Sequence, residues 1–219
     1  MAICAVASFS LAQSVTSANV VGYTAINVPV GFQMIAFNFS AIGGGTNTLG
    51  SALSGSISDG DELWVKSGST WTLYSYSSFD GGWEDIDFNL VNSLLVPNGT
   101  AMWYHKISGP GTITFAGEVG VSTSSIHLPV GFTQFGSASP VAFNPNDSTH
   151  VTWSGLADGC EIWKKTGGTW TLYSYSAFDG GWEDIDFNLV STIVDVGQGV
   201  WFHNIGAGAV TLSQSNPLQ

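Results

Sequence analysis

The chain has 219 residues, of which 9% are charged, and a formal net charge of −12 at pH 7. Its four basic residues are all lysines, which argues against binding to nucleic acid or to an anionic membrane surface, because both need many basic side chains. Ser, Thr, Asn and Gly supply most of the polarity instead, as is typical of exported β-rich proteins.

An apolar segment of small residues begins the chain. We expect residues 1–12 (MAICAVASFSLA) to be a signal peptide, or the remnant of one because the usual basic start is missing, with Gln13 as the first mature residue. A first buried strand at residues 2–11 is the alternative interpretation. Loss of this segment removes Cys4 and leaves Cys160, which we expect to be buried, without a disulfide partner. No later segment reaches about 20 apolar residues, so no membrane span is expected.

Short strands separated by turns are predicted along the first half of the chain. Apolar and β-branched runs are bounded by Pro, Gly, Asn and Asp, and no window shows sustained helical spacing. The predicted strands are 24–28, 31–39, 62–66, 71–76, 83–91, 101–107 and 112–119, with one helical turn at 49–53.

The strand predicted at residues 83–91 alternates apolar and polar residues. Ile86, Phe88 and Leu90 fall on one face, and acidic residues and Asn89 fall on the other. A period of two is the signature of a strand, so we expect the apolar set to face the core and the acidic set to face solvent.

A duplication organises the whole chain. Residues 70–91 (TWTLYSYSSFDGGWEDIDFNLV) recur as residues 169–190, and Ser78 against Ala177 is the only difference between the two blocks. The motifs PVGF and W(Y/F)H recur around these blocks in nearly the same register. The second half is therefore predicted to contain the same strands as the first.

The duplication predicts an all-β fold of two tandem repeats, each a small antiparallel β-sandwich or barrel of about six to eight strands. The first repeat, with an N-terminal strand arm, is assigned to residues 13–119 and the second to residues 120–219. The link at residues 118–125 has no Pro-rich or Gly/Ser-rich spacer, so we expect the two units to pack against each other or to share strands.

Two framing motifs resemble a known bacterial module. VPVGFQMIAFNF and GTAMWYHKISGPGTITFAGEV in the first repeat, with LPVGFTQFGSASP and VGQGVWFHNIGAGAVTLSQ in the second, are similar to a module that opens on LPxGWNLI and closes on GxGYWV. That module occurs in secreted and cell-surface proteins, often of Planctomycetes and Verrucomicrobia. Gln33-Met34 and Thr133-Gln134 replace its usual Asn-Leu pair. The resemblance implies an exported, non-enzymatic β module with an adhesive, scaffolding or surface role, and it brings no catalytic residues.

The first candidate site is acidic. Carboxylates crowded around a Gly-Gly turn can offer oxygen ligands to Ca²⁺, although their spacing is not that of an EF-hand. A solvated acidic face, or one paired with lysines, is the alternative, and no cofactor other than calcium is predicted. The candidate calcium ligands are Asp80, Glu84, Asp85, Asp87, Asp179, Glu183, Asp184 and Asp186.

The second candidate site is aromatic, since the chain has nine tryptophans. Exposed rings beside carboxylates stack and hydrogen-bond sugars in many binding modules. We expect most of the rings to lie in the core and Trp83 and Trp182 to be exposed, because they share a face with acidic residues. The predicted binding or assembly surface comprises Trp83, Asp85, Asp87, Asn89, Trp182, Asp184, Asp186, Asn188, Tyr74 and Tyr173.

Catalytic patterns are weak. The four histidines have no second His or Cys at metal-ligand spacing, and the chain has no nucleophile elbow and no phosphate loop. Paired carboxylates can cleave glycosides, but a duplicated pair on two small units without an obvious cleft argues against this activity. We therefore expect the protein not to be an enzyme.

The near identity of the two blocks suggests that both make the same contact. We expect a secreted or cell-surface, non-catalytic structural protein that self-associates through its repeated β units into a filament, sheath or surface layer. An unpaired arm at residues 13–28 would suit such assembly by adding to a neighbouring sheet. The alternative is a tandem carbohydrate-binding module that uses exposed Trp and acidic residues, with or without calcium. The expected partner is thus another copy of the chain or a polysaccharide.

Overall fold

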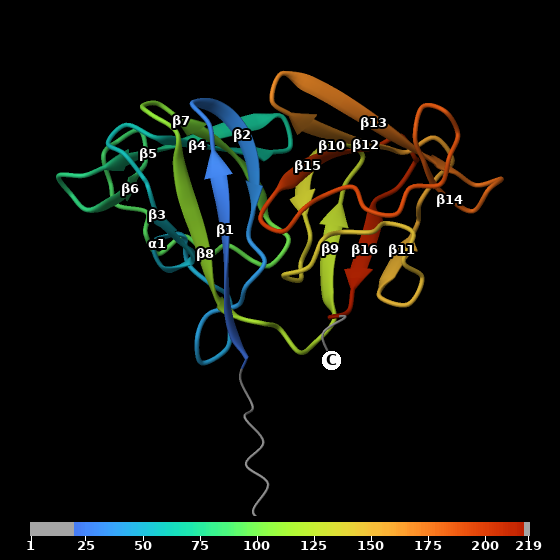
Figure 1. Ribbon diagram of the computed structural model, residues 1–219, viewed down its shortest axis with the longest axis horizontal. Helices are drawn as coiled ribbons and strands as arrows, with labels where there is room; N and C mark the ends of the chain where they lie inside the picture. The colour runs from blue at the N-terminus through green and yellow to red at the C-terminus, as the bar shows by residue number, and fades with distance from the viewer. Residues whose placement is uncertain (1–19, 217–219) are drawn as a thin grey trace, which may run out of the picture.

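The computed structural model describes residues 20–216. It is all-β and has two similar halves that lie side by side (Figure 1). Each half combines a three-stranded and a five-stranded antiparallel sheet, as in a β-sandwich. The predicted fold class is therefore confirmed. The predicted signal peptide at residues 1–12 and Cys4 lie outside the described residues.

The first unit contains eight strands and one helical turn, which lies where the sequence predicts it. These elements are β1 (Val21–Val28), β2 (Gly31–Ala36), α1 (Leu49–Ala52), β3 (Leu53–Gly55), β4 (Glu62–Ser67), β5 (Thr70–Ser77), β6 (Gly82–Glu84), β7 (Ala101–Lys106) and β8 (Gly111–Glu118). The two sheets have the strand orders β1-β8-β3 and β2-β7-β4-β5-β6.

The second unit repeats this arrangement. Its strands are β9 (Ser124–Leu128), β10 (Gly131–Gly136), β11 (Val151–Ser154), β12 (Glu161–Thr166), β13 (Thr169–Ser176), β14 (Gly181–Glu183), β15 (Gly199–Asn204) and β16 (Val210–Gln214). The three-stranded sheet has the order β9-β16-β11, which corresponds to β1-β8-β3. The five-stranded sheet has the order β10-β15-β12-β13-β14, which corresponds to β2-β7-β4-β5-β6.

Alternation along the strands separates a core face from an outer face in each five-stranded sheet. In β7, Met102 and Tyr104 are buried in the core of the first unit, while Trp103 and His105 point to the opposite face and are only partly buried. Phe202 of β15 takes the place of Tyr104 in the separate core of the second unit. Each repeat is thus long enough to bury a core of its own.

One pair of buried residues differs in chemistry between the two units. In the first unit, Lys106 Nζ lies 2.7 Å from Asp61 Oδ2, and both side chains are at most 2% exposed. In the second unit, the equivalent residues are Cys160 and Asn204, with 3.8 Å between the Sγ of the first and the Oδ1 of the second. Cys160 is a buried free thiol, as expected, and it replaces one half of an ion pair.

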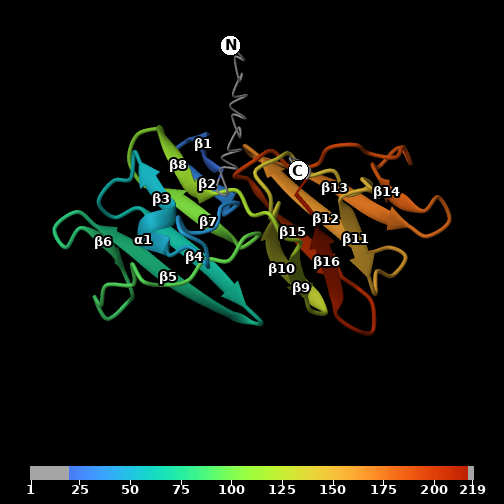
Figure 2. The ribbon, with the colours of Figure 1, turned by 90° about the horizontal axis from the view of Figure 1, so that it is seen from below.

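Small residues allow close approach at the junction of the units, where β7 and β15 lie on either side (Figure 2). A Cβ atom on Gly136 would lie 2.2 Å from Ala36 Cβ, and one on Gly199 would lie 2.7 Å from Ala101 Cβ. A backbone hydrogen bond of 2.8 Å from Ala36 N to Gly197 O also crosses the junction. The expectation that the two units pack against each other is confirmed.

The described part of the N-terminal arm is not free. β1 pairs with β8 along its whole length, from Val21 opposite Glu118 to Val28 opposite Gly111. The expectation of an unpaired arm at residues 13–28 is therefore wrong for Val21–Val28, because this strand completes the three-stranded sheet of its own unit.

The predicted strand at residues 83–91 is also wrong in length and orientation. β6 ends at Glu84, and Ile86, Phe88 and Leu90, which were expected in the core, are 75%, 83% and 52% exposed. Trp83 pairs with Tyr76 on the core face of the sheet, and the chain leaves the sheet two residues later. The alternating pattern therefore continues into a loop instead of covering the core.

Candidate functional site

The outer faces of the five-stranded sheets gather aromatic residues. In β4, Leu63 is buried in the core, while Trp64 and Lys66 lie on the outer face. The adjacent strands extend this surface, because Trp64 pairs with Trp103 of β7 and Lys66 pairs with Trp71 of β5. Three indole rings from three neighbouring strands thus share one face of the sheet.

Eight aromatic side chains from both units form one partly exposed surface, which we call the aromatic platform. Phe32 and Phe132 are 44% and 46% exposed, and Trp71 and Trp170 are each 43% exposed, while the other four rings are half-buried. The platform comprises Phe32, Trp64, Trp71, Trp103, Phe132, Trp163, Trp170 and Trp201.

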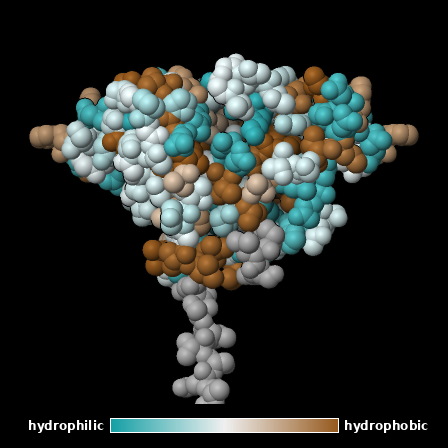
Figure 3. All heavy atoms as spheres, viewed as in Figure 1, coloured by the Kyte–Doolittle hydropathy of each residue, from teal (hydrophilic) through white to brown (hydrophobic). Residues whose placement is uncertain are grey.

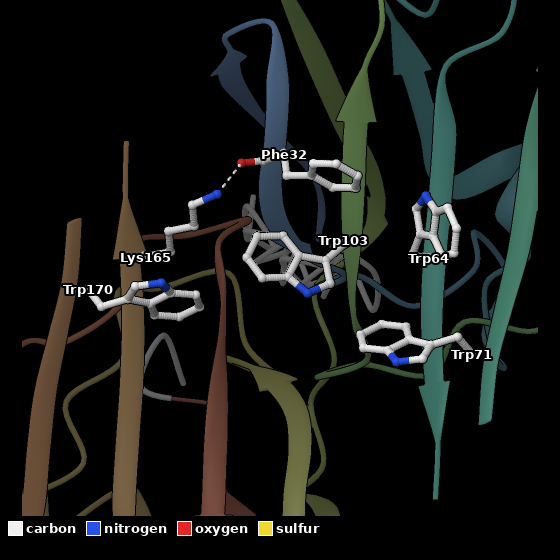
Figure 4. Close-up of a pocket in the computed structure, with 6 residues that line it drawn as sticks. All are labelled: Phe32, Trp64, Trp71, Trp103, Lys165 and Trp170. Atoms are coloured by element: carbon white, nitrogen blue, oxygen red, sulfur yellow. Dashed lines mark hydrogen bonds between the residues drawn. The ribbon is translucent and has the colours of Figure 1, made fainter. Parts of the chain in front are cut away.

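Two open pockets lie on the platform. Figure 4 shows the first, with a volume of about 380 Å³, in which Lys165 and Trp170 of the second unit complete a wall formed by aromatic residues of the first unit. The second pocket has a volume of about 310 Å³ and is lined by Phe132, Trp163, Trp170 and Trp201. Trp170 borders both pockets, so they are neighbours on a continuous surface.

Ring contacts across the junction of the units fix the platform. The ring centroids of Trp71 and Trp201 are 5.9 Å apart with an interplanar angle of 87°, and those of Trp103 and Trp170 are 6.1 Å apart at 86°. Edge-to-face pairs of this kind are favourable, because the positive edge of one ring meets the negative face of the other. The platform is therefore organised before any ligand binds.

Two lysines reinforce the same junction. Lys66 Nζ donates a hydrogen bond of 3.2 Å to Phe132 O, and Lys165 Nζ donates an equivalent bond of 3.2 Å to Phe32 O. The ammonium group of Lys165 also lies 5.0 Å from the centroid of the Trp103 ring, within the range of a cation–π interaction. Each lysine thus reaches from its own unit to the other.

A pair of polar side chains, one Glu and one His, borders the aromatic residues in each unit. Glu62 Oε2 lies 2.9 Å from His105 Nδ1 and accepts a hydrogen bond of 2.8 Å from Trp64 Nε1. Phe32 stacks on the His105 ring, with centroids 4.0 Å apart. About a quarter of each of the Glu62 and His105 side chains is exposed. Glu161, His203, Trp163 and Phe132 repeat this arrangement.

The tryptophans that were predicted to bind are not part of the platform. Trp83 and Trp182 are 1% and 0% exposed and lie in the two cores, so the expectation that they face solvent is wrong. Both sit opposite a core-facing tyrosine of the neighbouring strand. Tyr74 and Tyr173, also predicted to bind, are half-buried and pack against the same cores.

The predicted acidic residues flank β6 and β14. Asp80 and Asp179 lie in the turns before these strands, and Glu84 and Glu183 are their last residues. Asp85, Asp87, Asp184 and Asp186 lie in the loops that follow. Asp85 Oδ1 accepts hydrogen bonds of 2.9 Å from the backbone amides of Asp87 and Asn89, and the bonds from Asn89 are the main cause that lowers the Asp85 pKa. These bonds hold Phe88 at a φ of 62°, a left-handed conformation that costs an L-residue about 1–2 kcal/mol. Asp184, Asp186, Phe187 and Asn188 form the same loop in the second unit.

The candidate calcium ligands do not surround a common point. Within residues 20–216, no group of three or more His, Cys, Asp and Glu side chains is placed to hold a metal ion. Burial, together with the nearby Asp80 carboxyl, raises the pKa of Glu84, and burial with Asp179 raises the pKa of Glu183. Calcium binding stays a prediction.

None of the eight platform residues was part of the predicted site. The sequence of β4 contains a signal for one of them, because Trp64 alternates with the core residues Leu63 and Val65 and shares its face with charged neighbours. A large ring on the polar face of a strand indicates a contact outside the core.

Comparison of the chain with protein-family models, with curated proteins and with solved structures found no match. Among the described residues, no helix has the length and apolar character needed to cross a membrane.

Proposed function

We propose that this is an exported, non-catalytic protein that binds a polysaccharide chain on its aromatic platform. The observation that carries the proposal is the platform itself: six tryptophans and two phenylalanines from two units form a single exposed surface with two pockets. Indole and phenyl rings offer flat, rigid, apolar faces, on which the CH-rich faces of sugar rings can stack at little cost in conformational entropy.

The polar groups beside the rings fit the same ligand. A sugar stacked in the first pocket presents hydroxyl groups around its edge, and the partly exposed Glu62 and His105 can exchange hydrogen bonds with them. Glu161 and His203 stand in the same relation to the second pocket. Two equivalent pockets on one surface suit a ligand that is itself a repeat of one unit, as a linear polysaccharide is.

Affinity electrophoresis tests this proposal. The purified protein is run through native gels that contain one soluble polysaccharide each, from a panel of xylan, mixed-linkage β-glucan, galactomannan, glycol chitosan and alginate. We expect at least one polysaccharide to retard the protein, and Trp64→Ala combined with Trp163→Ala to weaken this retardation roughly tenfold or more, as expected for the loss of two stacking rings.

Trp64 and Trp163 are chosen because they line the pockets without taking part in the ring contacts that join the units. The matched control is Phe79→Ser combined with Phe178→Ser, which removes two rings that are 94% and 96% exposed outside the platform. The control should be retarded like the wild type. Equal retardation of the platform variant, or no retardation by any polysaccharide of the panel, would contradict the proposal.

A further inference from the structure

A third pocket adjoins the aromatic platform at the junction of the units. It has a volume of about 440 Å³ and shares Phe32 and Lys165 with the first platform pocket, so the two pockets are neighbours. Residues of β2 from the first unit and of β12 from the second line it, and Figure 3 shows hydrophilic and hydrophobic residues side by side where the two units meet. We call this space the seam pocket, and its polar residues include Gln33, Lys164, Asp195 and Gln198.

Polar side chains without firm partners distinguish the seam pocket from the platform. No hydrogen bond within residues 20–216 involves the side-chain amide of Gln33 or of Gln198. Lys164 Nζ and Asp195 Oδ2 are 4.0 Å apart, beyond hydrogen-bond distance, and these side chains are 21% and 68% exposed. The pocket thus contains two amides, an ammonium group and a carboxylate, which together can donate hydrogen bonds to a ligand and accept them from it.

Backbone hydrogen bonds hold the two sides of the seam pocket together. Gln198 N donates a bond of 3.1 Å to Asp195 O, so these two residues belong to one turn. Ala36 N of β2 donates a bond of 2.8 Å to Gly197 O, which joins this turn to the strand that contains Gln33. The elements that carry the polar groups are therefore positioned before a ligand binds, which lowers the cost of ordering them around it.

The duplication does not reproduce this chemistry on the other side of the junction. A pocket of about 280 Å³ lies at the equivalent place, but among the described residues it shares none with either platform pocket. The residues there that correspond to Gln33, Lys164, Asp195 and Gln198 are Thr133, Val65, Pro97 and Thr100. The surface therefore differs at its two ends, and this suits a ligand with two different ends, as a polysaccharide chain has.

We propose that the polysaccharide chain on the platform extends into the seam pocket, where Gln33, Gln198 and the Lys164–Asp195 pair hydrogen-bond the hydroxyl groups of one further sugar unit. This inference rests on the proposed function of the platform. Stacking on rings tolerates many sugars, because it requires only a CH-rich face. Hydrogen bonds discriminate between sugars, because a hydroxyl group in the wrong position leaves a polar group of the site unpaired. The seam pocket thus selects which polysaccharide the platform binds, and in which direction.

Dissociation constants from affinity electrophoresis, measured for each polysaccharide of the panel, test the proposal. The seam variant is Gln33→Thr combined with Gln198→Thr, which introduces the residue found at both equivalent positions in the other pocket. It should lose roughly tenfold in affinity for the polysaccharide that the wild type binds most tightly, since two amides no longer reach the sugar. Its affinities for the different polysaccharides should also become more alike. Each single variant should lose roughly threefold.

The matched control is the reciprocal change in the other pocket, Thr133→Gln combined with Thr100→Gln. It alters the junction to the same extent and should bind every polysaccharide like the wild type. Thermal unfolding of both double variants shows whether either change disturbs the fold, and the single variants separate binding from stability if it does.

The outcomes separate this inference from the function proposed for the platform. If Trp64→Ala with Trp163→Ala weakens binding but the seam variant binds like the wild type, the platform binds the polysaccharide and the extension into the seam pocket is overturned. Equal weakening by the control variant overturns the extension as well, because the effect then belongs to the junction in general. If no polysaccharide of the panel retards the wild type, both proposals fail.

Discussion

Asp61→Asn removes the negative partner of a buried ammonium group. Lys106 Nζ lies 2.7 Å from Asp61 Oδ2 and otherwise donates only to Ser56 O at 2.8 Å and Ser58 Oγ at 2.7 Å, both neutral acceptors. Breaking a buried ion pair in this way costs about 3–5 kcal/mol, because the remaining charge is neither paired nor hydrated. The loss is a large part of the roughly 5–15 kcal/mol that stabilises a typical domain.

The second unit shows how the same positions can be filled without charge. Cys160, Phe202 and Asn204 are buried together there and replace a carboxylate, a phenol and an ammonium group. A variant of the first unit with these three residues has no buried charge at these positions, and we expect it to lose less than about 2 kcal/mol. This neutral triple variant is Asp61→Cys, Tyr104→Phe and Lys106→Asn.

The pKa of Asp61 provides a second test of the same pair. Burial acts to raise this pKa, but hydrogen bonds from Lys106, Tyr104 and two backbone amides outweigh it and lower the pKa below the usual value of 3.8. The unfolded carboxyl therefore binds more protons than the folded one. Its stabilising contribution is complete above this usual value of 3.8, which the unfolded chain has, and is lost as the pH falls through the folded pKa. The neutral triple variant lacks this contribution and should be less sensitive to acid.

Urea unfolding followed by tryptophan fluorescence measures both effects, at neutral pH and at several values below pH 4. The reasoning is refuted if Asp61→Asn is as stable as the wild type, or if the neutral triple variant is as unstable as Asp61→Asn.

Three further variants or conditions test the fold and the calcium prediction. Gly136→Ala should lower stability in thermal unfolding by about 1–3 kcal/mol, because its Cβ would lie 2.2 Å from Ala36 Cβ, whereas Gly168→Ala, with nothing within 4 Å, should have little effect. Trp182→Ala should cost about 3–5 kcal/mol, since this ring is fully buried, and wild-type stability would contradict its place in the core. If calcium binds as predicted, EDTA should lower the melting temperature of the full chain, and an unchanged melting temperature would contradict the calcium prediction.

The duplication made the architecture predictable. Two copies of one strand pattern implied two cores, and the structure has them with equivalent sheet orders. The orientation of the block around Trp83 was not predictable from its period alone, because a regular alternation gives no sign that β6 ends at Glu84. Because β6 is short, the apolar residues that follow it (Ile86, Phe88 and Leu90) face solvent, while the Trp83 ring lies in the core.

The aromatic platform was only partly visible in the sequence. Trp64 stands on the polar face of its strand, and this local pattern could have identified it as an outer residue. The pairing of Trp103 with Trp170 depends instead on the packing of one unit against the other, which small residues such as Gly136 permit. A contact between residues 67 positions apart, set by tertiary packing, leaves no periodic signal along the chain.

The central claim, that one polysaccharide chain lies across both pockets, is tested most directly by isothermal titration with oligosaccharides of increasing length. These are cut from whichever polysaccharide retards the protein and contain about two to eight sugar units. The affinity should rise steeply once an oligosaccharide is long enough to reach both pockets, and the stoichiometry should change there from two ligands per protein to one. An affinity that does not depend on length, or two ligands per protein at every length, would contradict the claim.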